Sequence, residues 1–192
     1  MTLKKRTYII FLISSLLVVL FSVLIFLKLK SRTEINFPNH KPNIQFVEEV
    51  ENKVVISMTP KFIYSYALMK NGVYQHLDRN YTYDYIPTEL KNSILFQPIH
   101  RPSKGTVLKI ELYEPATIYF FFHYTADGGY SKIFQDLNGW EKCNDAPKYD
   151  IYNGDHGLKM NMYKMTADKG TYMIPPTIED SACFNIVFNF NN

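Results

Sequence analysis

The sequence predicts an all-β protein, with a β-sandwich or jelly roll over residues 44–192 behind one N-terminal transmembrane helix. Two observations predict the β fold. Short segments alternate apolar and polar side chains with the period of two that half-buried strands show, and Gly, Pro, Asn and Asp separate these segments. Outside the N-terminal apolar run, no window shows an apolar stripe at helical spacing over a useful length. About 150 residues are enough to bury such a core.

The N-terminal apolar run covers residues 8–27, reads YIIFLISSLLVVLFSVLIFL and contains no charged residue. A helix of this length spans about 30 Å, which matches the hydrocarbon thickness of a bilayer. A cleaved signal peptide, the alternative, has an apolar core of about 7 to 15 residues and a small-residue cleavage site. The first alanine of the chain is Ala67. We therefore expect an uncleaved anchor at 8–27, a short tail at 1–7 and a polar stalk at 28–43.

The membrane orientation does not follow from the flanking charges, because three basic residues stand on each side of the anchor. The two cysteines, Cys143 and Cys183, could form one disulfide, and Asn80 begins an Asn-Tyr-Thr glycosylation triplet. Both features favour a type II protein with an extracellular or luminal C-terminal domain. In the reverse orientation the domain would face the cytosol, and the cysteines would be a free pair.

The net charge of +3 comes from the membrane flanks. Six basic residues lie at or before Arg32 and no acidic residue precedes Glu34, so subtracting six from +3 leaves −3 for residues 33–192. A protein that binds nucleic acid shows clustered Lys and Arg on its folded domain. We therefore expect no nucleic-acid partner.

Nine strands are expected, each because its residues alternate between apolar and polar or because its residues are apolar throughout. VLKIELY and FNIVFNF alternate apolar with polar residues, while TIYFFFHY is apolar on both faces and predicts a central strand. The expected strands cover residues 44–50, 53–58, 61–69, 94–99, 107–113, 117–124, 158–162, 170–174 and 184–190.

Two similar stretches, TADGGY at 125–130 and TADKGTY at 166–172, follow expected strands. Asp followed by Gly two residues later suits a three-residue hairpin loop that ends in a glycine bulge. The prediction is therefore two β-hairpin turns. The alternative is a divided site, with Asp127 and Asp168 paired for acid–base chemistry or as ligands of a metal such as calcium.

No catalytic or nucleotide-binding motif occurs, and the five histidines show no ligand spacing. His123 lies within an apolar strand and is interpreted as a core residue. We expect no enzyme activity, cofactor or resident metal. Aromatic residues make up 16% of the chain, and Tyr and Trp offer broad contact surfaces with a polar tip. The candidate binding edge consists of loop residues that turn residues surround: Asp127, Tyr130, Trp140, Tyr149, Tyr152, Asp155 and His156.

The stretch DRNYTYDYIPTEL at 78–90 and the later segments LNGW and Tyr163-Lys164 form a further pattern. It resembles a galactose-binding-like β-sandwich, the accessory module of secreted polysaccharide lyases and glycosidases. The positions that carry the resemblance are Asp78, Arg79, Tyr81, Ile86, Pro87, Leu90, Tyr119, Leu137, Trp140, Tyr163, Lys164 and Gly170. The resemblance implies a sandwich fold and contact with carbohydrate.

Taken together, these features predict a membrane-anchored exoplasmic domain for non-catalytic recognition, with carbohydrate as the expected ligand. A structural or adhesive surface protein that binds protein partners is the first alternative. An anchored glycoside hydrolase that uses loop carboxylates is the second.

Overall fold

The computed structural model describes residues 43–151, 154–180 and 182–190. The expected tail, the anchor at 8–27 and all but the last residue of the stalk lie outside these ranges. Within the described ranges, no helix has the length and apolar character needed to cross a membrane.

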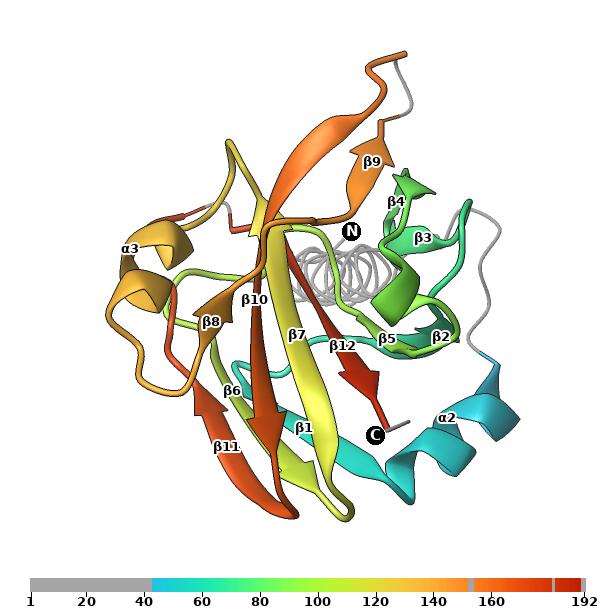
Figure 1. Ribbon diagram of the computed structural model, residues 1–192, viewed down its shortest axis with the longest axis vertical. Helices are drawn as coiled ribbons and strands as arrows, with labels where there is room; N and C mark the ends of the chain where they lie inside the picture. The colour runs from blue at the N-terminus through green and yellow to red at the C-terminus, as the bar shows by residue number, and fades with distance from the viewer. Residues whose placement is uncertain (1–42, 152–153, 181, 191–192) are drawn as a thin grey trace, which may run out of the picture. The chain divides into compact units, whose positions relative to one another are not determined.

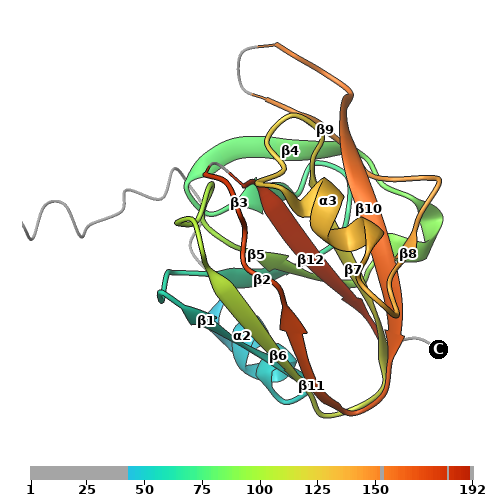
Figure 2. The same cartoon turned by 90° about the vertical axis from the view of Figure 1, so that its left-hand side faces the viewer.

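The described chain is predominantly β-structure in two antiparallel sheets, which confirms the predicted all-β class (Figures 1 and 2). The small sheet has the order β1-β6-β11, from Val54–Thr59, Val107–Leu112 and Gly170–Ile174. The large, nine-stranded sheet has the order β2-β5-β12-β7-β10-β9-β4-β3, with β8 beside β10. In that order these strands are Ser65–Leu68, Ile94–Gln97, Phe184–Asn189, Ala116–His123, Leu158–Ala167, Lys148–Asp150, Arg79–Tyr85 and Tyr74–His76, and β8 is Glu141–Lys142.

Two apolar clusters use opposite faces of the large sheet. The first joins residues of both sheets and includes Phe120 and Phe122 of β7. The second comes from the large sheet and its loops, and it includes Tyr119 and Phe121 of the same strand. Because side chains alternate across a strand, β7 fills both clusters, as the two-faced apolar sequence predicts. The last residue of β7, His123, follows Phe121 on the face of the second cluster.

The strands expected at 53–58, 94–99, 107–113, 117–124, 170–174 and 184–190 are confirmed, with small changes at their ends. The strand expected at 158–162 also forms, but it continues to Ala167 and is twice the expected length. Only Ser65–Leu68 forms a strand within 61–69. The strand expected at 44–50 is wrong, because Ile44–Glu51 forms helix α2. The Asn43 side chain accepts a hydrogen bond from Phe46 N, the N-cap interaction that starts helices, and Phe46, Val47 and Val50 turn toward the first cluster at helical spacing.

Neither TAD stretch forms the predicted hairpin. Asp127 lies two residues before Gly129, the N-cap of helix α3 (Tyr130–Gln135), and its carboxylate accepts hydrogen bonds from Gly129 N at 3.0 Å and Ser131 N at 3.2 Å. Asp168 lies between β10 and β11, which belong to different sheets, because β10 pairs with β7 and β11 pairs with β6. Asp and Gly serve helix starts and crossover turns as readily as hairpins, so the local sequence did not separate these structures.

The start of α3 is packed against the segment that precedes β12. A Cβ on Gly128 would overlap with Cβ of Ala182, and Gly128 has a φ of +59°. Replacing Gly128 by alanine is therefore expected to lower the unfolding free energy by more than about 1 kcal/mol, as urea denaturation would measure. Gly105→Ala is the matched control, since Gly105 has a φ of +76° but no atom within 4 Å of an added Cβ. Equal losses in the two variants would contradict the packing argument.

The predicted disulfide is wrong, since neither Cys143 nor Cys183 is in a disulfide bond. Cys143 follows β8 and its backbone N–H donates to Met162 of β10, whereas Cys183 directly precedes β12. The order β8-β10-β7-β12 puts three strand spacings between the cysteines, about 14 Å. A disulfide needs Cα atoms within about 7 Å.

Candidate functional site: a histidine cluster

Three histidines from separate segments meet at one end of β7. His76 is in β3, His100 is in the loop after β5, and His123 ends β7. Their ring centroids lie 5.1 Å apart for His76 and His100, 5.9 Å for His76 and His123, and 6.5 Å for His100 and His123. Together with two neighbouring tyrosines, Tyr81 and Tyr149, these residues form what we call the histidine cluster.

The two tyrosines come from the adjacent strands β4 and β9, which pair near Tyr83 and Tyr149. Tyr149 stacks on His123, with centroids 4.0 Å apart and an angle of 18° between the planes. Tyr81 lies 5.1 Å from His100 and 6.2 Å from both other histidines. The half-buried Tyr81 therefore links all three imidazoles.

The cluster contains buried polar atoms that lack hydrogen bonds. His76 is 1% exposed and His123 is 4% exposed, while His100 is half-buried. Nε2 of His123 contacts Oε1 of Gln75 at 2.8 Å, but Nε2 of Gln75 and both ring nitrogens of His76 make no hydrogen bond of good geometry to a described residue. The Pro98 carbonyl is close enough to His76 to act on its pKa. Buried polar atoms are nearly always paired in folded proteins, so these atoms are available to form hydrogen bonds with a ligand or with water.

Burial keeps the three imidazoles neutral near pH 7. It lowers the pKa of His123 to about 3, with further lowering from His100 and the Arg101 charge. It also lowers the pKa of His100 to about 4, to which Arg101 and Arg79 add, and it holds the pKa of His76 well below its usual range. Each ring therefore carries one N–H donor and one acceptor nitrogen.

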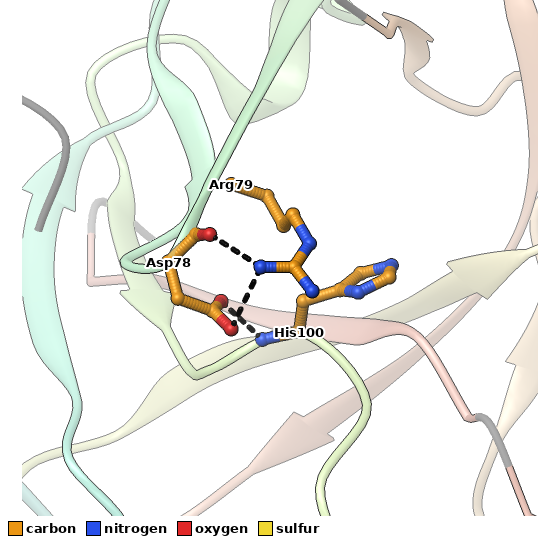
Figure 3. Close-up of polar contacts among 3 residues, drawn as sticks. All are labelled: Asp78, Arg79 and His100. Atoms are coloured by element: carbon orange, nitrogen blue, oxygen red, sulfur yellow. Dashed lines mark hydrogen bonds and ion pairs between the residues drawn. The ribbon is translucent and has the colours of Figure 1, made fainter. Parts of the chain in front are cut away.

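Charged residues Asp78, Arg79 and Arg101 form a rim beside the cluster (Figure 3 shows the first two with His100). Nη1 of Arg79 donates to the Asp78 carbonyl at 2.8 Å and lies 3.5 Å from Oδ2 of Asp78. The backbone N–H of His100 donates to Oδ1 of Asp78 at 2.7 Å. The Asp78 carboxylate thus fixes both Arg79 and the loop that carries His100 and Arg101.

Of the binding residues that were predicted from the sequence and that the structure describes, Tyr149 is the one that lies in the histidine cluster. Tyr149 is only 5% exposed and Tyr130 is fully buried, so the expected exposure of both is wrong. Tyr130 belongs to α3 and packs on Phe120 with centroids 4.8 Å apart. Trp140 is half-buried and meets Phe134 edge to face at 5.0 Å, which makes it part of the core wall.

The other candidate residues lie apart from the cluster or outside the described ranges. His156 is exposed and pairs with Asp150, Nδ1 to Oδ2 at 2.8 Å, a contact that raises the pKa of His156 and lowers that of Asp150. Asp155 and Asp168 are exposed, and Tyr152 is outside the described residues.

Metal binding was the alternative reading of Asp127 and Asp168. Both carboxylate oxygens of Asp127 accept backbone hydrogen bonds at the start of α3. No group of three or more His, Cys, Asp or Glu residues in the described ranges is arranged to hold a metal ion.

Sequence reasoning missed His76, His100 and Arg101, because their positions depend on pairing between distant strands. A local signal did exist. Asp78, Arg79 and Tyr81 are the first residues of the pattern that resembles a galactose-binding-like module, and they lie at the rim and within the cluster.

Comparison with known proteins supports the fold class alone. No protein-family model and no curated protein matches the sequence. One solved structure with a similar fold is "The structure of a beta-glucuronidase from glycoside hydrolase family 2", with a TM-score of 0.52 and 14% identity. The match covers 71% of this chain and 14% of the glucuronidase chain. The similarity is one of fold: part of a glycosidase chain has a β-fold like that of this chain.

Proposed function

We propose that the chain is a membrane-anchored recognition protein whose exoplasmic β-domain binds carbohydrate at the histidine cluster without cleaving it. The observation that carries this proposal is the half-buried pair of rings, Tyr81 and His100, beside the fixed charges of Asp78 and Arg79. Sugar rings pack their apolar faces on aromatic side chains, while a few positioned polar groups bind their hydroxyls. The likeness of this fold to part of a glycosidase chain is what suggests carbohydrate as the class of ligand.

A non-catalytic role fits the acids at this site. Glycoside hydrolysis usually needs two carboxyl groups about 5 to 9.5 Å apart, one on each side of the scissile bond. Among the described residues that make up the cluster and its rim, Asp78 is the one carboxylate, and it is bonded to Arg79 and to the backbone of His100. Asp78 therefore fits a positioning role.

The membrane anchor at 8–27 and the exoplasmic location belong to this proposal on sequence grounds. In that location Asn80, which is exposed, would be available for glycosylation. The separation of Cys143 and Cys183 across the sheet would keep them from bonding to each other there.

Adhesion to protein partners is the second candidate, and one groove favours it. A groove of about 270 Å³ between α2 and β2 is lined by Phe46, Tyr66 and Val73, together with Leu68, which is 43% exposed. β2 ends the order of the large sheet, and an end strand offers backbone groups to a partner. Such a protein would self-associate or capture a partner in the absence of glycan.

A glycan array with the full-length protein in a mild detergent tests the carbohydrate proposal. Tyr81→Ala is expected to weaken binding by tenfold or more, because it removes the half-buried ring that links the imidazoles. Tyr113→Ala is the matched control, since Tyr113 is 45% exposed and follows β6 of the small sheet, and it is expected to bind as the unaltered protein does. Binding is expected to be equal in calcium and in a chelator.

Circular dichroism should confirm that both variants are folded. Failure of the folded, unaltered protein to bind any glycan would contradict carbohydrate recognition and favour the adhesive alternative. Equal loss in the two variants would place the binding surface elsewhere.

A further inference from the structure

We propose that the histidine cluster binds an acidic saccharide, one that carries a carboxylate or a sulfate group, and that this binding takes up protons. The inference rests on the carbohydrate function proposed above and names the ligand class of the same site.

The first argument is the local charge. Arg79 and Arg101 face a single carboxylate, Asp78, while the three imidazoles are neutral near pH 7. The rim therefore has a positive charge, although residues 33–192 together carry −3. A local field of this sign attracts anionic groups and repels cations.

The second argument is the supply of free donors. Nη1 of Arg79 is held by Asp78, and the other guanidinium nitrogens of Arg79 make no hydrogen bond to a described residue. A guanidinium group matches the two oxygens of a carboxylate or a sulfate. His76 lies edge to face with His100 at 5.1 Å, and its ring has no side-chain hydrogen-bond partner among the described residues, so it offers a further N–H to the polar network of the site.

The third argument is the coupling between anion and proton. The arginine charges and burial together disfavour the charged form of the imidazoles. A bound anion offsets the arginine charges and so raises the pKa of the nearest histidines, which then gain protons at mildly acidic pH. By linkage, the anion must bind more tightly as the pH falls.

The protonation of the imidazoles depends on charged and titratable groups from each element around the cluster. The titratable or charged residues that face the imidazoles are His76 of β3, Arg79 and Tyr81 of β4, Asp78 before them, Arg101 of the loop after β5, Tyr149 of β9 and Cys183 before β12. Burial raises the pKa values of Tyr149 and Cys183, so both stay neutral near pH 7. Asp78 is thus the only described group among them that opposes the arginines.

The test is isothermal titration calorimetry of the full-length protein in detergent, at about 0.15 M salt and at pH 7.5, 6.5 and 5.5. The four titrants are size-matched neutral, uronate-containing and sulfated oligosaccharides, and inorganic sulfate alone. We expect at least one acidic oligosaccharide to bind tenfold or more tightly than the neutral one. We also expect its affinity to rise severalfold from pH 7.5 to pH 5.5, with net proton uptake in buffers of different ionisation enthalpy.

Variants locate the effect. The double variant Arg79→Gln with Arg101→Gln is expected to lose tenfold or more in affinity for the acidic oligosaccharide and to keep its affinity for the neutral one. Lys169→Gln is the matched loss of a positive charge. Ala167 lies opposite Ala116 at the far end of the β7–β10 pair, about 23 Å along the strands from His123, and Lys169 follows it. Lys169→Gln is expected to change neither affinity.

Each other result has a definite meaning. Equal binding of neutral and acidic oligosaccharides would overturn the acidic ligand and leave the carbohydrate function standing. Binding of none would overturn both. Inorganic sulfate that binds as tightly as the sulfated oligosaccharide would show a free-anion site and overturn the saccharide. Affinity that is constant over the pH range would overturn the uptake of protons.

Discussion

Phe120→Ala is expected to lower the free energy of unfolding by about 3 to 5 kcal/mol, the usual cost of truncating a fully buried aromatic residue. Phe120 is completely buried at the centre of β7. Its ring stacks on Phe134 at 4.8 Å and on Phe184 at 5.4 Å, so it joins α3 to β12. Urea denaturation followed by circular dichroism would measure the loss.

Tyr113→Ala provides the control for this prediction. Tyr113 is 45% exposed and lies just after β6, so its truncation is expected to change the unfolding free energy by no more than about 0.5 kcal/mol. A loss below about 1 kcal/mol for Phe120→Ala would contradict the central position of β7 between the two apolar clusters.

Acidification from pH 6.5 to 4.5 is expected to lower the unfolding free energy by about 3 to 5 kcal/mol through His76 and His123. In the unfolded chain these residues take up protons below about pH 6.5. In the folded protein His123 has a pKa of about 3, and His76 is also strongly lowered. The folded state therefore binds fewer protons in this window, so stability that is complete above pH 6.5 is lost as the pH falls.

The slope of stability against pH identifies the residues responsible. His123→Asn is expected to reduce that slope by about 1.4 kcal/mol per pH unit, the effect of one proton. His156→Asn is the control with the opposite sign, because the ion pair with Asp150 raises the pKa of His156 and its stabilisation is present below pH 6.5. A slope that His123→Asn leaves unchanged would contradict the buried, neutral state of this imidazole.

The parts of the fold that followed from the sequence are those whose strands carry their own pattern. β7 is apolar on both faces, and β6 and β12 alternate apolar with polar residues. These patterns predicted the three strands and the burial of their apolar side chains. β3, β8 and β9 have two or three residues each, too few to carry a pattern of their own. β3 pairs with the next strand, β4, whereas β8 pairs with β10 and β9 pairs with β10 and with β4. Helix α2 was missed because its apolar stripe is only eight residues long.

The site depended on the same long-range pairing. Tyr149 was selected as a loop residue of a binding edge, whereas it is a strand residue that is 5% exposed and stacks on His123. The histidines are spread over β3, a loop and β7, and β3 and β7 are not neighbours in the sheet order. Their rings meet because the large sheet curls, which no local pattern of the sequence predicts. Cys143 and Cys183 illustrate the reverse case, since an even number of cysteines says nothing about their distance across a sheet.

The central claim is that carbohydrate binds at the histidine cluster, and the most direct measurement is NMR of the imidazole carbons and protons during an oligosaccharide titration. We expect the His100 signals to shift with the affinity measured by calorimetry and His123 to follow. His156, which is exposed and paired with Asp150, is expected to stay unchanged. Saturating carbohydrate that leaves His100 and His123 unmoved, or that shifts only His156, would contradict the assignment of the site.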